Sequence, residues 1–173
     1  MKDDEGSKRS AAEQQFRREM LPLKDKLFRL ALRITLDRSE AEDITQETLV
    51  RMWTLRDEWA TIDSIEAYCL SVCHRLAIDH IRKVQLHAEK ESDIIRFQRT
   101  VVHAEKETDE RLDIVRSLMD QLPETQRTIM VLRDIEGMRY DEIARITGLT
   151  ETQVKVYLHR ARTRIKEKIG KKL

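Results

Sequence analysis

Apolar residues recur at spacings of three and four along most of the chain, the pattern of amphipathic helices that bury one face. The first such stretch extends from Glu13 to about Arg33, and Pro22 within it predicts a kink. The preceding residues 1–12 are polar, so we predict a flexible N-terminal tail there.

Two further helices are predicted before residue 87. One ends at about Arg56 and the other covers about residues 65–86, with residues 59–64 as the loop between them. Each begins with a polar residue followed three positions later by glutamate, the spacing of a capping box that satisfies free backbone N–H groups. The predicted capping pairs are Ser39 with Glu42 and Asp63 with Glu66.

A heavily charged segment, residues 88–111, separates this block from a second one and predicts a linker. The chain of 173 residues contains only 4 Gly and 2 Pro, too few for the turns of a β-sheet fold. We therefore predict an all-α fold of two small helical domains, 13–87 and 112–170, joined by a flexible charged linker. The helices predicted in the second domain are at about 112–121, 124–135, 140–147 and 151–169.

The two cysteines, Cys69 and Cys73, lie four apart in a predicted helix, which separates their Cβ atoms too far for a disulfide. We interpret them as reduced core thiols of a cytoplasmic protein. A zinc site with His74 and His80 would lack a fourth ligand at motif spacing, so we expect no metal and no cofactor. No apolar run is long enough to span a membrane, and the acidic N-terminus is unlike a signal peptide, so we expect no membrane insertion.

Charge is balanced overall, at a net of +1, but it is uneven along the chain. Residues 37–58 carry seven acidic and three basic residues, whereas residues 150–173 carry eight basic and two acidic ones. The basic end favours binding to a polyanion, and the acidic segment favours a different partner.

The last two predicted helices have the layout of a helix-turn-helix. Tyr140–Thr147 is a short helix, and Gly148 follows where a helix commonly ends in a left-handed residue. Thr150 and Gln153 have the spacing of a capping box for the longer basic helix. One face of that helix is apolar and predicts the seam to the short helix: Val154, Leu158, Ala161 and Ile165.

The opposite face of the basic helix carries small or neutral side chains flanked by cations. In a recognition helix, such side chains meet base edges in the major groove while the cations meet phosphates. The neutral stripe is Thr152, Val156, His159 and Thr163, and the flanking cations are Lys155, Arg160, Arg162 and Lys166.

Segments in both predicted domains resemble bacterial sigma factors of the sigma-70 family. Residues 134–144 and 154–162, with Leu122-Pro123 and Gln126-Arg127 upstream, resemble the domain that reads the minus-35 promoter element. Residues 41–53 resemble the helix that docks on the clamp helices of RNA polymerase, and residues 76–82 resemble the helix that reads the minus-ten element. Because the chain has no room for the extra domains of housekeeping sigma factors, it resembles the short extracytoplasmic-function type.

The resemblance implies a role for each of three residue sets. The first binds core polymerase, and its four members also share one helical stripe opposite the apolar arc of their helix; the second contacts minus-ten DNA; the third contacts minus-35 DNA. The sets are Asp43, Gln46, Glu47 and Val50 for polymerase; Trp59, Thr61, Asp63, Arg75, Asp79, Arg82 and Lys83 for the minus-ten element; and Thr152, Lys155, Val156, His159, Arg160 and Arg162 for the minus-35 element.

Three residues depart from the family pattern. Leu49 stands where phenylalanine is frequent, and Arg75 replaces a frequent asparagine, which puts the minus-ten base preference in doubt. Arg139 replaces the usual serine cap of the short helix, and arginine cannot accept a hydrogen bond from the free N–H groups. We expect Arg139 to reach a phosphate instead.

The implied partners are core RNA polymerase, through its clamp helices and flap, promoter DNA and an anti-sigma factor. The implied function is promoter-specific transcription initiation with local DNA melting, which is not an enzymatic activity. We expect the free chain to bind promoter duplex weakly, because one basic domain neutralises few phosphates and the linker lets the two domains move independently.

Three alternatives remain at this point. A helix-turn-helix repressor or activator would leave residues 41–53 unexplained and would need a dimerisation segment. An enzyme would need a phosphate loop, a nucleophile elbow or a zinc motif, none of which occurs. A helical adaptor that binds only protein would not co-elute with core polymerase and support initiation, which is the observation that separates these alternatives.

Overall fold

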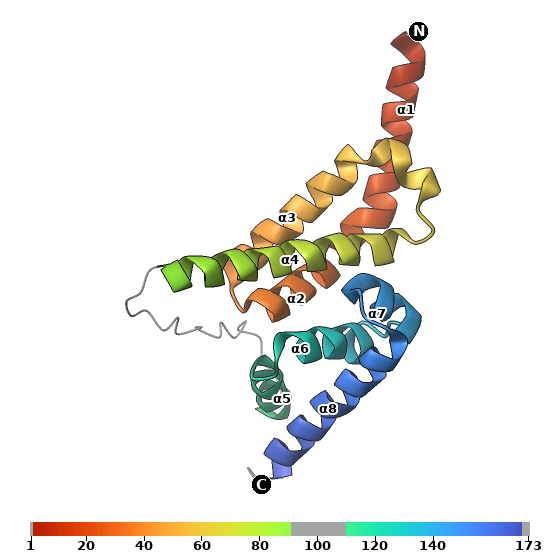
Figure 1. Ribbon diagram of the computed structural model, residues 1–173. Coiled ribbons are helices and arrows are strands. Elements are labelled where there is room, and N and C mark those ends of the chain that lie inside the picture. Colours follow the sequence, from red (N-terminus) through yellow and green to blue (C-terminus); the bar gives the residue numbers. More distant parts are fainter. Residues whose placement is uncertain (1, 91–109, 171–173) are drawn as a thin grey trace.

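The computed structural model describes residues 2–90 and 110–170, and these residues contain helices and no strand (Figure 1). The predicted all-α fold is confirmed. The helices of the N-terminal domain are α1 (Lys2–Gln15), the π-helix η1 (Phe16–Met20), the 3₁₀ helix η2 (Leu21–Leu23), α2 (Lys24–Thr35), α3 (Arg38–Thr54), the 3₁₀ helix η3 (Arg56–Thr61) and α4 (Ile65–Lys90). Those of the C-terminal domain are α5 (Glu110–Asp120), α6 (Glu124–Met130), the π-helix η4 (Val131–Ile135), α7 (Tyr140–Thr147) and α8 (Glu151–Gly170).

The beginning of the chain differs from the sequence prediction. Helix α1 starts at Lys2, where we predicted a flexible tail over residues 1–12. Pro22 lies in η2, between the π-helix η1 and helix α2, so the long predicted helix is interrupted there. Proline lacks the N–H that an α-helix needs in its interior, which explains the change of helix type at this point.

Both predicted capping pairs in the N-terminal domain were wrong. Leu36 adopts a left-handed conformation, with φ of 57°, and ends α2 early enough for Asp37 to cap α3. Oδ1 of Asp37 accepts a hydrogen bond from the Glu40 N–H at 3.0 Å, while Glu42 pairs with Arg38. At the start of α4, Oγ of Ser64 accepts from the Ala67 N–H at 3.2 Å, so Ser64 and not Asp63 is the cap.

The N-terminal domain is built on α2, which packs against both α3 and α4. Its core includes Leu30, Met52 and the two cysteines, which are buried free thiols as predicted. Sγ of Cys73 donates to the Leu27 carbonyl at 3.4 Å. Burial raises the pKa of each thiol to about 12, so neither forms a reactive thiolate near neutral pH.

The C-terminal domain packs α8 against α6 and α7. Its buried side chains include Ile129 of α6, Leu132 of η4, Ile143 of α7 and Leu158 of α8. The basic helix α8 therefore supplies one apolar face to the core and leaves its other faces to solvent.

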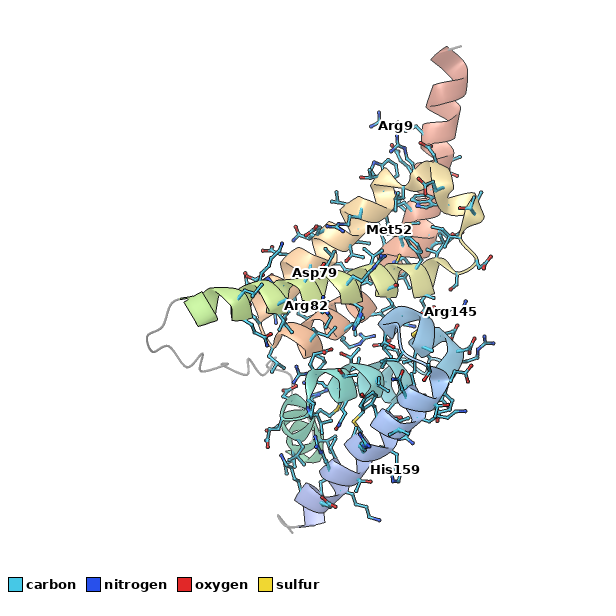
Figure 2. All side chains as sticks on the ribbon, in the orientation of Figure 1. Arg9, Met52, Asp79, Arg82, Arg145 and His159 are labelled. Carbon is cyan, nitrogen blue, oxygen red and sulfur yellow. The ribbon has the colours of Figure 1, made fainter. Side chains whose placement is uncertain are left out.

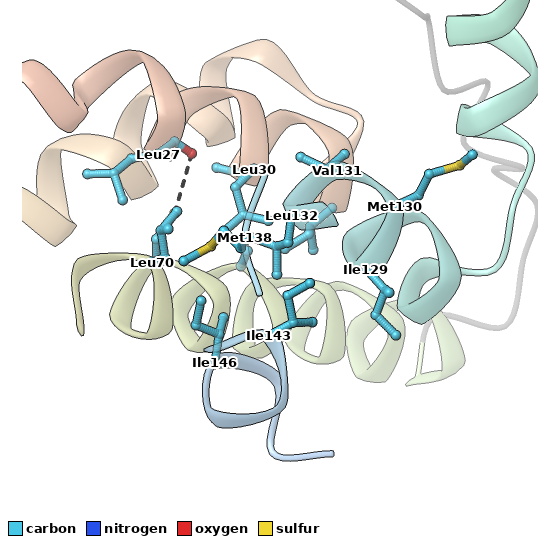
Figure 3. Close-up of a cluster of buried hydrophobic side chains, with 14 of the residues drawn as sticks. Leu27, Leu30, Leu70, Ile129, Met130, Val131, Leu132, Met138, Ile143 and Ile146 are labelled. Carbon is cyan, nitrogen blue, oxygen red and sulfur yellow. Dashed lines mark hydrogen bonds between the residues drawn. The ribbon is translucent and has the colours of Figure 1, made fainter. Parts of the chain in front are cut away.

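The two domains are docked against each other, contrary to the expectation that they move independently. Figure 3 shows Leu27 and Leu30 of α2 in one buried cluster with Leu132 and Met138 of the C-terminal domain. Helix α6 also contacts α2, and α7 contacts α4. Residues 88–90 and 110–111 of the predicted linker are helical, and the rest of that segment lies outside the described residues. We call this arrangement the docked state.

The corrected cap of α3 can be tested by two alanine substitutions. We expect Asp37→Ala to lower the free energy of unfolding by about 1 kcal/mol, because the Glu40 N–H loses its acceptor. The matched control is Ser39→Ala, which removes the exposed hydroxyl of the cap that the sequence predicted. Urea denaturation followed by circular dichroism measures both; an equal loss in the two variants would contradict the assignment.

Candidate nucleic-acid interface

The helix-turn-helix forms as the sequence predicted. Gly148 ends α7 with φ of 73°, and its N–H donates to the Ala144 carbonyl at 2.9 Å. Thr150 and Gln153 form the predicted reciprocal cap: the Gln153 N–H donates to Oγ1 of Thr150 at 3.2 Å, and the Thr150 N–H donates to Oε1 of Gln153 at 2.9 Å. The glycine reverses the chain and the cap starts α8 directly after it.

The faces of α8 are divided as predicted. Val154, Leu158, Ala161 and Ile165 are buried against the domain. Thr152, Val156, His159 and Thr163 are exposed on the other side, and Val156 keeps 41% of its accessible surface. Figure 2 shows His159 on the outward side of α8. The helix therefore presents a neutral stripe to solvent.

Two cations beside this stripe have partners within the domain. The ammonium group of Lys155 lies 5.4 Å from the centre of the Tyr140 ring, and the Arg133 guanidinium lies 4.7 Å from the same ring. Arg162 forms a two-pronged ion pair with Asp134, which raises the pKa of Arg162. A phosphate contact by Arg162 therefore has to compete with Asp134.

The Arg139 side chain is held by a carboxylate instead of capping the helix. Its Nε and Nη2 donate to the two carboxylate oxygens of Asp141, at 3.0 and 2.7 Å, and this pairing lowers the pKa of Asp141. Arg145 donates to the same carboxylate at 3.3 Å. At the start of α7, the Glu142 side chain supplies a capping hydrogen bond: its Oε2 accepts from the Arg139 N–H at 2.9 Å.

Most of the predicted minus-ten residues face the C-terminal domain across two grooves. One groove is lined by Arg75, Asp79 and Arg82 of α4. The other is lined by Thr61 and Asp63, which precede α4. The residues that line both grooves from the far side are Arg145 and Ile146 of α7. Lys83 is exposed on the outer part of α4.

Trp59 does not belong to this surface. Its side chain is only 4% exposed, and Nε1 donates to the Met52 carbonyl at 2.9 Å. The ring centroids of Phe16 and Trp53 each lie 6.3 Å from that of Trp59 and 5.6 Å from each other, so the three rings form one cluster. The indole is part of the core that anchors η3, so in the docked state it is not accessible to DNA.

The predicted polymerase-binding stripe is exposed on α3. Asp43, Gln46, Glu47 and Val50 all face solvent, and Val50 keeps 62% of its accessible surface. Glu47 pairs with Arg51 one turn later, at 2.6 Å. A large exposed aliphatic residue surrounded by polar side chains suits a helix-docking surface.

The sequence reading missed the residues that join the domains. Arg145 was not singled out, although it lines both grooves. Glu136 was not singled out either, yet its carboxylate pairs with Arg29 of α2 at 2.7 Å. The one available signal was the spacing of cations along α2, which places them on one side of that helix. No property of a single helix shows which distant acid pairs with these cations.

The chain matches two families over the segments that form the two domains. Residues 21–86 match Sigma-70 region 2, and residues 112–165 match Sigma-70, region 4. The chain belongs to the sigma-70 family. Among the residues that the structure describes, no helix of this sigma factor is long and apolar enough to cross a membrane.

Curated relatives place the sigma factor in the extracytoplasmic-function (ECF) group. The ECF RNA polymerase sigma factor SigE of Mycolicibacterium smegmatis is 29% identical over 152 residues, which are 85% of this chain and 58% of SigE. The RNA polymerase sigma factor SigV of Bacillus subtilis is 28% identical over 138 residues, which are 80% of this chain and 81% of SigV. The chain thus spans little more than half the length of SigE.

A solved structure has the same fold. The sigma factor RpoE from Bartonella quintana, crystallised in complex with the anti-sigma factor NepR, superposes with a TM-score of 0.78 at 22% identity. The superposition covers 88% of this chain and 95% of RpoE, so it spans both domains.

The partly buried His74 makes the free energy of unfolding depend on pH. Burial lowers the pKa of His74, which lines a groove between the domains; Glu124 opposes this shift and Arg75 adds to it. The folded chain therefore binds the proton more weakly than the unfolded chain, whose histidine titrates near pH ~6.5. Stability is lost as pH falls below about 6.5 and continues to fall until the lowered pKa is passed.

We expect urea midpoints of the wild-type chain to fall more steeply between neutral pH and pH ~5.5 than those of His74→Gln, because glutamine does not titrate. The comparison of the two chains removes the contributions of all other titrating groups. Parallel pH profiles for the two chains would contradict this prediction.

Proposed function

We propose that this sigma factor binds core RNA polymerase and directs initiation at promoters that carry its minus-35 and minus-ten elements. The observation that carries this proposal is the pairing, in one chain, of a complete helix-turn-helix with an exposed neutral stripe and a separate domain with an exposed acidic stripe. Matches to both sigma-70 regions support the same assignment.

Polymerase docks on α3 in this proposal. Asp43, Gln46 and Glu47 supply hydrogen-bond acceptors and charge around the exposed aliphatic side chain of Val50. The clamp helices of polymerase are the proposed partner of this stripe, and the flap is the proposed partner of the C-terminal domain. An apolar anchor within a polar rim is the usual arrangement when one helix docks on another.

The minus-35 element is read by α8. Thr152, Val156 and His159 lie on the face that would meet base edges, and Lys155 and Arg160 flank it toward the phosphates. Arg162 serves as a phosphate contact only after it leaves Asp134. It is therefore the weakest of the proposed contacts.

The minus-ten element is bound along α4. Arg75, Arg82 and Lys83 are exposed cations on this helix and suit the phosphates of a melted strand, with Asp79 between them. Thr61 and Asp63 precede the helix and are the proposed contacts to a base. Trp59 is left out of the proposed contacts because it is buried.

An anti-sigma factor is the proposed negative regulator. RpoE from Bartonella quintana was crystallised with the anti-sigma factor NepR, and CnrH, whose structure superposes with a TM-score of 0.63, with the cytosolic domain of CnrY. NepR and CnrY are the partners of RpoE and CnrH, respectively. Here the proposal rests on the shared two-domain fold.

A double substitution on α3 tests polymerase binding. We expect Asp43→Arg with Gln46→Ala to weaken binding to core polymerase at least about tenfold and to abolish promoter-dependent transcription in vitro, because the docking stripe loses two hydrogen-bond acceptors and the charge at position 43 is reversed. The matched control is Glu42→Arg, which reverses a charge on another face of α3. Unaltered affinity in a pull-down with core polymerase, at unchanged helix content, would contradict the assignment of this stripe to polymerase binding.

Substitutions on α8 separate base reading from phosphate binding. We expect Val156→Ala and His159→Ala to change the preferred minus-35 sequence, with a loss of about 1–3 kcal/mol at the affected base pair. Lys166→Ala should instead weaken binding to all sequences alike, because a phosphate contact carries no sequence information. Selection from a randomised minus-35 library with holoenzyme measures this; an unchanged preference in both neutral-stripe variants would contradict it.

A further inference from the structure

Helix α2 carries a stripe of cations that faces the C-terminal domain. Lys26, Arg29 and Arg33 are spaced by three and four residues, so they lie on one side of the helix. Nε and Nη2 of Arg29 donate to the two carboxylate oxygens of Glu136, at 2.7 and 3.1 Å. Nη1 of Arg33 donates to Oδ1 of Asp120 at 2.6 Å. We call these three residues the α2 stripe.

The acids that pair with the α2 stripe are almost completely removed from water. The side chain of Glu136 is 2% exposed and that of Asp120 is 7% exposed. Lys26 adds a second cation 3.9 Å from Glu136. A buried carboxylate is stable only beside a cation, so each acid depends on the partner that α2 supplies.

The local backbone of the C-terminal domain delivers Glu136 to α2. The π-helix η4 ends with the Glu136 N–H donating to the Val131 carbonyl at 3.0 Å. Gly137 then takes φ of 71°, and the Met138 N–H returns to the Leu132 carbonyl at 2.9 Å. This reversal projects Glu136 toward α2, and Leu132 and Met138 lie in the same buried cluster as Leu27 and Leu30 of α2.

The docked state cannot read both promoter elements at once. Elements near positions −35 and −10 are about 25 base pairs apart, or about 85 Å along B-form DNA. A compact chain of this length has a radius of gyration of about 16 Å. Because α7 of the helix-turn-helix contacts α4 directly, the two DNA-reading surfaces lie within one such body. The domains have to separate before both elements are bound.

Separation exposes the α2 stripe next to the proposed minus-ten surface. Nζ of Lys26 lies 2.6 Å from Oε1 of Glu66, in the first turn of α4. That turn follows Thr61 and Asp63, which line a groove with Ala67 and Tyr68. The carboxylates that pair with Arg29 and Arg33 both belong to the C-terminal domain, so both arginines lose these partners when that domain leaves.

We propose that the α2 stripe is a DNA phosphate-binding surface, and that in the docked state the carboxylates of Glu136 and Asp120 occupy the places of phosphates. This inference rests on the proposed function, to which it adds a contact and a means of self-inhibition. Guanidinium groups bind carboxylates and phosphates with the same two-pronged geometry, so one ligand excludes the other. DNA and the C-terminal domain then compete for α2.

The test compares two pairs of substitutions that both break the docked state. Glu136→Gln with Asp120→Asn removes the acids and leaves the cations, whereas Arg29→Gln with Arg33→Gln removes the cations. Interdomain distances are measured between spin labels on cysteines introduced at the exposed positions Arg17 and Glu167. The native thiols, whose pKa is raised to about 12 by burial, stay unlabelled.

We expect the interdomain distance to increase in both variants, but DNA binding to increase in only one. The probe is a fluorescein-labelled oligothymidylate, which reports phosphate contacts without base reading or polymerase. In the acid-free variant (Glu136→Gln with Asp120→Asn), two arginines become free, so its affinity for the probe should rise about tenfold near 0.15 M salt. The slope of log K against log salt concentration should become steeper by about 1.4. The cation-free variant (Arg29→Gln with Arg33→Gln) should show no gain in affinity for the probe.

Matched controls remove the effect of net charge. Glu13→Gln with Glu42→Gln changes the charge as the acid-free variant does, and Arg9→Gln with Arg38→Gln matches the cation-free variant; both control pairs consist of exposed partners outside the interface. If a double variant loses helix content, the single substitutions Glu136→Gln and Arg29→Gln replace it. An unchanged interdomain distance would overturn the self-inhibition, and an equal affinity gain in both variants would overturn the phosphate surface. Polymerase binding plays no part in either readout, so this result is independent of the α3 test.

Discussion

The contact between α2 and the turn after η4 holds the two domains in one body. It combines apolar packing of Leu30 with Leu132 and Met138, and a carboxylate, Glu136, that is too buried to be stable without Arg29. The guanidinium of Arg127 adds a polar tie, because it donates from α6 to the Ile34 carbonyl near the end of α2 at 3.2 Å. This contact, together with the one between α7 and α4, decides which surfaces of the two domains face each other.

The docked state treats the three proposed surfaces differently. The stripe on α3 and the outer face of α8 are open to solvent, whereas the minus-ten surface of α4 forms one wall of grooves closed by α7. A partner that binds both the docked and the separated state with equal affinity does not change their ratio. Docking through α3 alone is therefore neutral toward separation. The free energy for separation has to come from contacts that exist only in the separated state, such as DNA that spans both promoter elements.

Much of the site was readable along single helices. The helix-turn-helix, its left-handed Gly148, its Thr150–Gln153 cap and the division of α8 into buried and exposed faces all depend on residues within a few positions of each other. The burial of Trp59 could not be predicted from its own helix. It is an apolar residue in a polar segment, and it is buried because Phe16 of a helix distant in sequence packs against it. The cap of α3 was misplaced for a related reason. Asp37 and Ser39 are equally good caps by residue type, and α3 begins after Asp37 because the left-handed Leu36 ends α2 directly before it.

By itself the sequence determined the all-α fold, the amphipathic faces of helices such as α8, and the side chains that we propose for DNA and polymerase. Periodicity, capping and charge are properties of neighbouring residues, so they are present in the linear order. The tertiary structure alone decided that the domains dock, that Glu136 and Asp120 pair with the α2 stripe, and that the proposed minus-ten surface faces α7. These pairings join residues about 90 to 110 positions apart, and no local pattern specifies which distant acid meets which cation; the packing of α2 against the C-terminal domain does.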